Sequence, residues 1–349
     1  MRVAQPIPVL SFLVALSAFS FAQAKTRVEI QAAPKLKTYN VDTNAITVSG
    51  ISAGAFFAVQ MQVAFSSTIN GAAIVAGGPY HCAEGQMTSA LTSCMSTGLI
   101  DVNGILRYIE AQEKAIDDTA NLSSHKVLMW SGTNDHTVSQ SVMKSLAHMY
   151  QTGLGVNDTS IYFNYSSGHA WITDYYGSSC STTASPYINN CDFDLAGESF
   201  KMFYGPDLKD RAAKMVGANL LAFDQVEFGG GAMASLGNTG YIYVPGACAD
   251  GSIACALHVN FHGCNQGGYK LGQTYVQHSG LNRWAETNNI IVVYPQAASA
   301  LLKENPNGCF DWWGYNDAKY ATQDGTQMKV MKKIIDRVSG ANSFGASFV

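Results

Sequence analysis

The sequence predicts an α/β protein with a mainly parallel sheet flanked by helices, and three observations lead to this fold class. Strand-like apolar runs alternate with helix-like runs along most of the chain. Hydrophobic residues make up 47% of the 349 residues, which is enough for a large buried core. Charged residues make up only 13%, the net charge is −4 and no Lys/Arg run occurs, so we expect a compact protein with no nucleic-acid partner.

The predicted elements follow each other in the order that a parallel sheet requires. Parallel strands need a crossover connection, which is usually a helix. Residues 170–238 are rich in Ser, Gly and Asn and are predicted to be loop or cap material. The predicted strands are 45–49, 71–78, 126–132, 160–165, 240–245, 256–263 and 290–295, and the predicted helices are 55–65, 105–117, 139–151, 281–289 and 325–338.

The N-terminus has the pattern of a secretory signal peptide. Arg2 precedes an apolar run, and an Ala-x-Ala site ends at Ala24. The apolar run is shorter than a spanning helix usually needs, so a membrane anchor is the less favoured alternative. We therefore expect residues 1–24 to be removed, the chain to be exported without a membrane span, and residues 25–349 to form a single domain.

The eight cysteines of an exported chain predict disulfides. Zinc is the competing interpretation, but no CxxC pair or HxxxH spacing supports a metal site. Connectivity cannot be read from sequence, so the simplest of many pairings joins cysteines that are close together and leaves one long-range pair. The expected pairs are Cys82/Cys94, Cys180/Cys191, Cys248/Cys255 and Cys264/Cys309.

A candidate nucleophile lies in the stretch Gly50-Ile51-Ser52-Ala53-Gly54. Gly-x-Ser-x-Gly between a strand and a helix is the nucleophile elbow of α/β-hydrolases, in which a sharp turn exposes the serine at the sheet edge. The helix that follows offers free N–H groups and a positive dipole end. A tight structural turn is the alternative, but the flanking strand and helix favour Ser52 as a nucleophile.

A serine nucleophile needs a base, and the base needs an orienting carboxylate. In this fold the acid and then the histidine follow the serine along the chain. Asp135 follows the predicted strand 126–132 and could otherwise be an Asx-turn residue. His169 follows the strand 160–165 in a loop of small residues. Asp158 and Asp174 are weaker alternatives for the acid, and His81, His136 and His262 are alternatives for the base.

The two oxyanion donors complete the predicted site, and they imply a circular permutation. One donor is the N–H of Ala53, directly after the serine, and the other usually comes from a His-Gly loop after an earlier strand. Too few residues precede Ser52 for such a strand, whereas the strand 256–263 near the other end of the chain leads into His262-Gly263-Cys264. We therefore expect a permuted fold in which residues 40–170 carry Ser, Asp and His, residues 239–340 carry the oxyanion loop, and the Cys264 N–H is the second donor.

Taken together, five segments resemble the secreted polyhydroxybutyrate depolymerases of the single-domain, circularly permuted type. The segments are GISAGAFFAVQMQVAFS, GTNDHTV, SSGHAW, FHGCNQ and NGCFDWWGY, and the resemblance runs over most of residues 40–340. It implies an α/β-hydrolase fold, a triad of Ser52, Asp135 and His169, and hydrolysis of short-chain 3-hydroxyalkanoate polyesters or oligomers without a cofactor or metal. It also places Trp312 or Trp313 at a substrate crevice.

Two parts of this interpretation have alternatives. The tryptophans could be core residues instead of a platform for an apolar chain. The chain could be another secreted carboxylesterase, such as a feruloyl or acetyl esterase or a hydrolase of oxidised polymer, or an inactive binding protein on a hydrolase scaffold. The separate substrate-binding domains of many such depolymerases are absent from this sequence, which leaves soluble oligomers as possible substrates. We expect a monomer.

Overall fold

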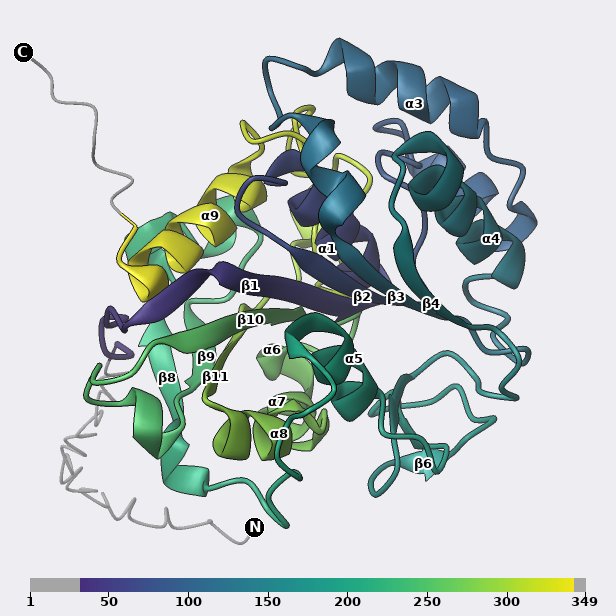
Figure 1. The fold of residues 1–349 in the computed structure, drawn as a ribbon. Coiled ribbons are helices and arrows are strands. Elements are labelled where there is room, and N and C mark those ends of the chain that lie inside the picture. Colours follow the sequence, from purple (N-terminus) through teal and green to yellow (C-terminus); the bar gives the residue numbers. More distant parts are fainter. Residues whose placement is uncertain (1–31, 342–349) are drawn as a thin grey trace, which may run out of the picture. The chain divides into compact units, whose positions relative to one another are not determined.

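The computed structural model of the protein describes residues 32–341, so the predicted signal peptide lies outside the described residues. Figure 1 shows the elements in chain order. The strands are β1 (Val41–Ile51), β2 (Gly71–Val75), β3 (Lys126–Trp130), β4 (Asp158–Tyr162), β5 (Trp171–Thr173), β6 (Ser178–Ser179), β7 (Ile188–Asn190), β8 (Leu220–Asp224), β9 (Thr239–Tyr243), β10 (Cys255–Phe261) and β11 (Ile290–Tyr294). The α-helices are α1 (Ala53–Ala64), α2 (Met87–Leu91), α3 (Val102–Ala111), α4 (Gln140–His148), α5 (Leu195–Tyr204), α6 (Gly268–Leu271), α7 (Thr274–His278), α8 (Leu281–Asn288) and α9 (Thr326–Ser339).

The large sheet confirms the predicted mainly parallel, permuted fold. Its strand order is β4-β3-β2-β1-β10-β11-β9-β8. Neighbours from β4 to β11 are parallel, and β9 runs antiparallel to β11 and β8. The strand that precedes Ser52 is thus early in the chain, yet its neighbour β10 comes from the far part of the sequence.

Helices cover both faces of this sheet, which is why its strands are apolar on both sides. Figure 1 shows α1, α3, α4 and α9 on one face and α5 to α8 on the other. Along β2, Ala72 and Ile74 pack into one core cluster, and Ala73 and Val75 pack into a second cluster on the opposite face. Side chains of a strand alternate between faces, so a continuous apolar run is what a strand buried on both sides requires.

Most predicted elements are present, but residues 170–238 contain more regular structure than the sequence indicated. A small sheet of β5, β7 and β6, the helix α5 and the edge strand β8 lie there. Helix α5 begins where the side chain of Asp194 accepts a hydrogen bond from the Gly197 N–H at 2.9 Å. This is a standard N-cap arrangement that short helices need.

A buried row of polar side chains joins β1 to β10. His258 of β10 lies between two β1 hydroxyls, with Nδ1 2.8 Å from Thr47 Oγ1 and Nε2 2.6 Å from Ser49 Oγ. Asn260 Nδ2 donates to Ser49 Oγ at 2.8 Å. Since buried polar groups need partners, a slip between the two strands would leave several of them unpaired. The row therefore fixes the register of the strand that carries the candidate nucleophile.

Stability is expected to fall as the pH drops from about 6.5 to about 4. Burial lowers the pKa of His258 from 6.5 to about 3 and that of His262 to about 4. In this window the unfolded chain binds protons that the folded chain excludes. Each histidine therefore lowers the free energy of unfolding by up to about 1.4 kcal/mol per pH unit of acidification. Urea unfolding at a series of pH values measures this slope.

Asp311 provides the control for this pH dependence, because its ionisation makes the folded state more stable, relative to the unfolded state, as the pH falls. Burial raises the pKa of its carboxyl group from 3.8 to about 7. Its contribution to stability is thus fully present below the unfolded pKa and is lost as the pH rises through the folded pKa. The Asp311→Asn variant should lose stability more steeply than the parent on acidification. An equal or shallower slope would contradict these assignments.

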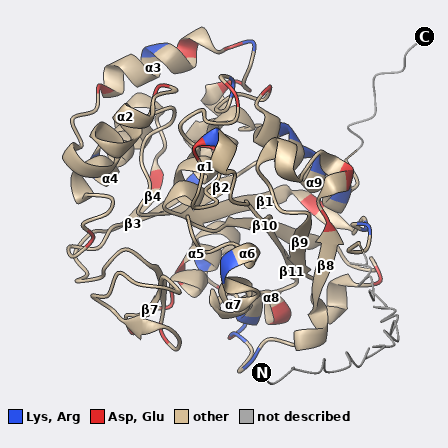
Figure 2. Cartoon of the chain, turned by 180° about the vertical axis from the view of Figure 1, so that it is seen from behind, with Lys and Arg blue, Asp and Glu red and all other residues tan. Residues whose placement is uncertain are grey.

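The structure also contains four disulfide bonds and few charged side chains. All eight cysteines are paired as predicted, in the bonds Cys82–Cys94, Cys180–Cys191, Cys248–Cys255 and Cys264–Cys309. Figure 2 shows the charged residues dispersed over a mostly uncharged chain. Among the described residues, none of the helices combines the length and apolar character needed to cross a membrane.

Candidate active site

Ser52 occupies a strained turn between β1 and α1, as the elbow motif predicts. Its φ is 56° and its ψ is −126°, a combination that residues with a side chain rarely adopt. A Cβ on Gly50 would lie 2.2 Å from the Gly54 carbonyl oxygen, and a Cβ on Gly54 would lie 2.2 Å from the Phe261 carbonyl oxygen. The first glycine thus lets the chain reverse into the helix, and the second lets the end of β10 approach that helix.

The carboxyl ends of β1 and β10 bring the His-Gly segment beside Ser52. The parallel register pairs Gly50 with Phe261, so both strands end at the same edge of the sheet. A Cβ built on Gly263 would lie 3.3 Å from Ser52 Cβ and 3.3 Å from the Ile51 carbonyl oxygen. Two segments from opposite parts of the sequence therefore lie so close at the candidate site that a side chain on Gly263 would crowd Ser52.

Asp135 and His169 are hydrogen-bonded to each other. His169 Nδ1 lies 2.8 Å from Asp135 Oδ2, and both residues are buried. A carboxylate can only accept, so Nδ1 carries the proton and Nε2 is left as the basic nitrogen. The other carboxylate oxygen, Oδ1, accepts the N–H groups of Thr137 and Val138 at 2.9 Å each. These bonds hold the carboxylate in one orientation.

The loops that carry Asp135 and His169 leave β3 and β4 side by side and are bonded together. The Asn134 N–H donates to the Ser167 carbonyl oxygen at 3.2 Å. A Cβ on Gly132 would lie 2.0 Å from that same oxygen, so only glycine permits this approach. The His169 N–H donates to Thr183 Oγ1 at 2.9 Å. Hydrogen bonds thus hold His169 through both its backbone N–H and its ring.

Ser52 and His169 face one cavity of about 260 Å³ at this sheet edge. In the described part of the chain, no hydrogen bond joins the serine hydroxyl to the imidazole, a contact that often tightens only when substrate binds. The cavity is lined by Ile51, Ser52, Met95, Thr137, His169, Thr183, Tyr187, Gly263, Cys264, Asn265, Gln266 and Asn307.

Two backbone N–H groups near Ser52 are free to receive a ligand oxygen, that of Ala53, the next residue in the chain, and that of Cys264, which lines the cavity. Within residues 32–341, neither the Ala53 N–H nor the Cys264 N–H donates a hydrogen bond, whereas the N–H groups of Gly263, Asn265 and Gln266 all do. Ala53 begins helix α1, whose N-terminus carries partial positive charge. An anionic oxygen placed between these two amides would meet two donors.

The two predicted substrate tryptophans lie in a buried cluster. Trp312 and Trp313 are 6% and 9% exposed, and neither is among the residues that line the cavity. Trp312 stacks on Phe56 of α1 with ring centroids 4.2 Å apart. The stacking of Trp312 thus supports the helix behind Ser52, and a direct contact of either tryptophan with substrate stays a prediction.

Among the described residues, none of the sequence-based alternatives for the base lines the cavity, and neither alternative acid is hydrogen-bonded to His169. Asp158 and His136 are exposed, Asp174 pairs with Arg211, His81 stacks on Tyr108, and His262 is buried below the oxyanion loop.

Sequence reasoning gave no role to several residues that line the cavity. Gln266 was inside the quoted His-Gly-Cys segment, so its spacing from Gly263 was an available signal. Thr183 and Tyr187 belong to the loop closed by Cys180 and Cys191, and no local pattern indicates where that loop packs.

Comparisons with known proteins identify relatives of this chain. No family model matches the sequence. A poly(3-hydroxybutyrate) depolymerase of Delftia acidovorans is 40% identical over 315 residues, which cover 89% of this chain and 63% of the relative. A polyhydroxybutyrate depolymerase of Talaromyces funiculosus is 37% identical over 327 residues, which cover 88% of this chain and 94% of the relative. This chain thus spans less than two thirds of the first relative and nearly all of the second.

Two solved structures have the same fold. One is a PHB depolymerase from Penicillium funiculosum, and the other is a serine-to-alanine variant of a PHB depolymerase in complex with an R3HB trimer. Each has a TM-score of 0.80 and 34% sequence identity, and each match covers 88% of this chain and 99% of the solved chain. The chain therefore belongs to the polyhydroxybutyrate depolymerase family.

Proposed function

We propose that this chain is a serine esterase that hydrolyses poly(3-hydroxybutyrate) or its oligomers through an acyl-enzyme. The observation that carries the proposal is that Ser52, His169 and Cys264 line one cavity. Asp135 is hydrogen-bonded to that histidine, and Ala53, with a free N–H, directly follows the strained serine. These are the parts that acyl transfer needs, namely a nucleophile, an oriented base and oxyanion donors. The family relatives supply the polyester as the substrate class.

The lining of the cavity fits a neutral polyester. It contains no Asp, Glu, Lys or Arg, and it combines apolar groups with uncharged polar ones. A 3-hydroxybutyrate chain alternates methyl-bearing carbons with ester oxygens and carries no charge except at its acid end. Such a chain needs apolar contact with a few hydrogen-bond partners, as small-molecule sites commonly provide. A substrate with several charges would have to be desolvated here without partners.

The first half of the reaction forms an ester with Ser52. His169 Nε2 takes the hydroxyl proton while Ser52 Oγ attacks the carbonyl carbon, and the carbonyl electron pair moves to its oxygen. The N–H groups of Ala53 and Cys264 stabilise that oxyanion. Asp135 holds the ring and stabilises its positive charge. When the tetrahedral intermediate collapses, His169 gives its proton to the departing alkoxide, which leaves as the hydroxyl end of the cleaved polymer.

The second half returns the enzyme to its starting state. A water molecule takes the place of the alcohol, His169 removes its proton, and the hydroxide adds to the acyl carbon. The second oxyanion collapses, Ser52 leaves with the proton from His169, and the carboxylic acid product is released. Every proton is carried by the imidazole, so the cycle draws on the side chains already described and we propose no cofactor or metal.

The test compares substrates of different classes on the purified, disulfide-bonded protein. We expect clearing of emulsified poly(3-hydroxybutyrate) and release of 3-hydroxybutyrate oligomers, with much weaker release of ferulate from a feruloyl ester. Preferential release of ferulate would assign the chain to a feruloyl esterase instead. Binding to the polymer without hydrolysis of any ester, and without labelling of Ser52 by a fluorophosphonate, would indicate an inactive binding protein.

The Asp135→Asn variant is expected to lower kcat on p-nitrophenyl butyrate by roughly 10³- to 10⁴-fold. An amide cannot accept the Nδ1 proton and also keep both of its backbone donors, so the ring would adopt the wrong tautomer. Asp158→Asn is the control, because Asp158 is exposed at the start of β4. Equal activity of both variants and the parent would rule out Asp135 as the triad acid.

Three further statements belong to the same proposal. The four disulfides favour a location outside the reducing cytosol, and together with the N-terminal pattern they support export with cleavage near Ala24. We also propose one catalytic domain over residues 25–349 that is active as a monomer. Size-exclusion chromatography with light scattering tests the oligomeric state.

A further inference from the structure

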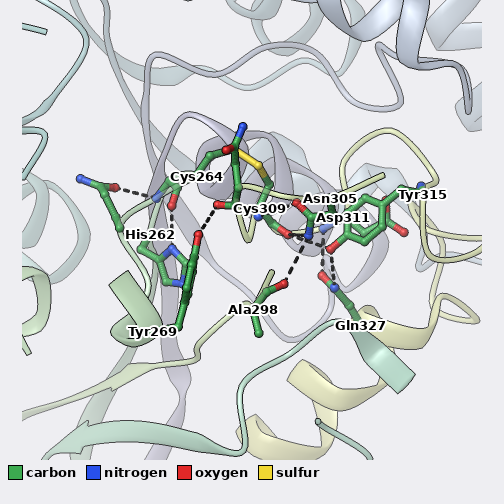
Figure 3. Close-up of a disulfide and its surroundings, with 12 residues drawn as sticks. His262, Cys264, Tyr269, Ala298, Asn305, Cys309, Asp311, Tyr315 and Gln327 are labelled. Carbon is green, nitrogen blue, oxygen red and sulfur yellow. Dashed lines mark hydrogen bonds between the residues drawn. A yellow bond between two sulfur atoms is a disulfide. The ribbon is translucent and has the colours of Figure 1, made fainter. Parts of the chain in front are cut away.

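We propose that His262 is a positioning residue that aims the Cys264 N–H at the oxyanion through its hydrogen bond to the Gly263 carbonyl oxygen. The inference rests on the proposed function, because it takes the Cys264 N–H as an oxyanion donor. Figure 3 shows the His262 ring beside the segment that carries Cys264 and its disulfide to Cys309. The ring does not line the cavity and is only 1% exposed, so it acts through the loop and not on the substrate.

The partners of the ring determine which nitrogen carries the proton. The Ala297 N–H lies 3.1 Å from His262 Nε2, and a backbone amide can only donate. Nε2 is therefore the acceptor, and the proton of the neutral ring is on Nδ1. Nδ1 lies 2.7 Å from the Gly263 carbonyl oxygen, which it can reach as a donor. Both nitrogens are thus satisfied in one tautomer only.

The planarity of the peptide bond converts this contact into an orientation of the donor. The Gly263 carbonyl and the Cys264 N–H belong to the same peptide unit, and in a trans peptide they point in opposite directions. Fixing the carbonyl oxygen on the buried His262 ring therefore directs the Cys264 N–H away from that ring. Cys264 lines the cavity that contains Ser52, and its N–H has no partner among the described residues.

Neighbouring contacts hold the two ends of this peptide, and the His262 ring makes the shorter of the two hydrogen bonds to its carbonyl oxygen. The Gly263 N–H donates to Gln266 Oε1 at 2.7 Å, and the Asn265 N–H donates to the Asn307 carbonyl oxygen at 2.7 Å. These bonds fix the chain before and after the peptide. The Gly263 carbonyl oxygen accepts two hydrogen bonds, one from His262 Nδ1 at 2.7 Å and a longer one from the Gln266 N–H at 3.2 Å. Loss of the His262 bond would leave the carbonyl held by the longer bond alone, so the peptide plane could tilt more easily.

Two substitutions distinguish the donor role of His262 Nδ1 from the acceptor role of Nε2. In His262→Asn, the side-chain NH₂ occupies the place of Nδ1, so the donor to the Gly263 carbonyl is retained and the acceptor for Ala297 is lost. In His262→Gln, the side-chain oxygen occupies the place of Nε2, so the acceptor is retained and the donor is lost. Each variant loses one buried hydrogen bond and a similar volume, which makes them a matched pair for stability.

We expect His262→Gln to lower kcat on p-nitrophenyl butyrate by about 10- to 100-fold, a part of what removal of a whole oxyanion donor costs. KM should change less than about threefold, because the donor acts mainly in the transition state. His262→Asn should recover most of the lost kcat, although both variants melt at similar temperatures. Equal kcat values for the two variants, or a lower value for the asparagine variant, would overturn the inference.

A measurement on the unmodified protein covers the case in which a variant fails to fold. The ¹⁵N chemical shifts of His262 distinguish a ring protonated on Nδ1 from one protonated on Nε2. We expect the Nδ1 tautomer near neutral pH, and the Nε2 tautomer would refute the proposed contact. The Ser52→Ala variant, measured alongside, distinguishes failure of the proposed function from failure of this inference. If the parent shows no hydrolysis that depends on Ser52, the proposed function fails. If the parent is active and His262→Gln is equally active, only the role of His262 fails.

Discussion

The Ser52→Ala variant is expected to lower kcat on p-nitrophenyl butyrate by about 10⁴-fold or more, because removal of a serine nucleophile leaves only the oxyanion donors and binding to accelerate the reaction. The fold should be unaffected. Alanine must adopt the same φ of 56°, so the strain of the turn is unchanged, and only one hydroxyl group is removed. Initial-rate kinetics and thermal melting of both proteins measure these two effects.

An exposed serine provides the matched control for this variant. Ser123 Oγ donates only to the Ala120 carbonyl oxygen at the surface, so Ser123→Ala should retain parental turnover. Fluorophosphonate labelling should be lost in Ser52→Ala and retained in Ser123→Ala. Full turnover by Ser52→Ala would remove Ser52 from the mechanism and with it the acyl-enzyme.

The Gly54→Ala variant is expected to lose both stability and activity. A Cβ at this position would lie 2.2 Å from the Phe261 carbonyl oxygen and 2.5 Å from the His262 carbonyl oxygen, and backbone atoms cannot rotate away. The end of β10 must move, at a cost of about 3 kcal/mol or more. Because the displaced segment leads directly to Cys264, kcat should fall by about 10²-fold as well. Urea unfolding and steady-state kinetics on p-nitrophenyl butyrate measure the two losses.

Gly246→Ala is the control for this second prediction. No heavy atom lies within 4 Å of a Cβ at Gly246, and its φ is not positive. The added methyl group should therefore leave stability within about 0.5 kcal/mol of the parent. A Gly54→Ala variant with the stability and kcat of the parent would show that β10 does not abut α1 as closely as described.

The features that could be predicted from the sequence are those that a short local pattern encodes. The elbow glycines, the strand before Ser52 and the helix after it lie within one short stretch, and the structure has that strand and that helix on either side of Ser52. The four disulfide pairs were also predictable, since three of them join cysteines 7 to 12 residues apart. Pairing the near neighbours left Cys264 and Cys309 for each other.

The remaining features depend on contacts between segments that are far apart in the chain. Gln266 joins two segments that line the cavity, because its amide NH₂ donates to the Tyr187 carbonyl oxygen at 2.9 Å. Both tryptophans are buried and Trp312 stacks on Phe56, a contact between distant segments that the sequence did not indicate, and their contact with substrate stays a prediction. Helix α5 and strand β8 were not predicted, because the surrounding Ser- and Gly-rich sequence obscured their periodicity. No local propensity determines which surface such segments cover.

The late position of β10 in the chain has a consequence for biosynthesis. Translation delivers Ser52, Asp135 and His169 first, but the central strand β1 has no neighbour on its other side until residues 255–261 have emerged. A nascent or prematurely terminated polypeptide would carry the whole proton relay and still lack the amide of residue 264. The permuted order of the strands thus keeps the site incomplete until about three quarters of the chain has been made.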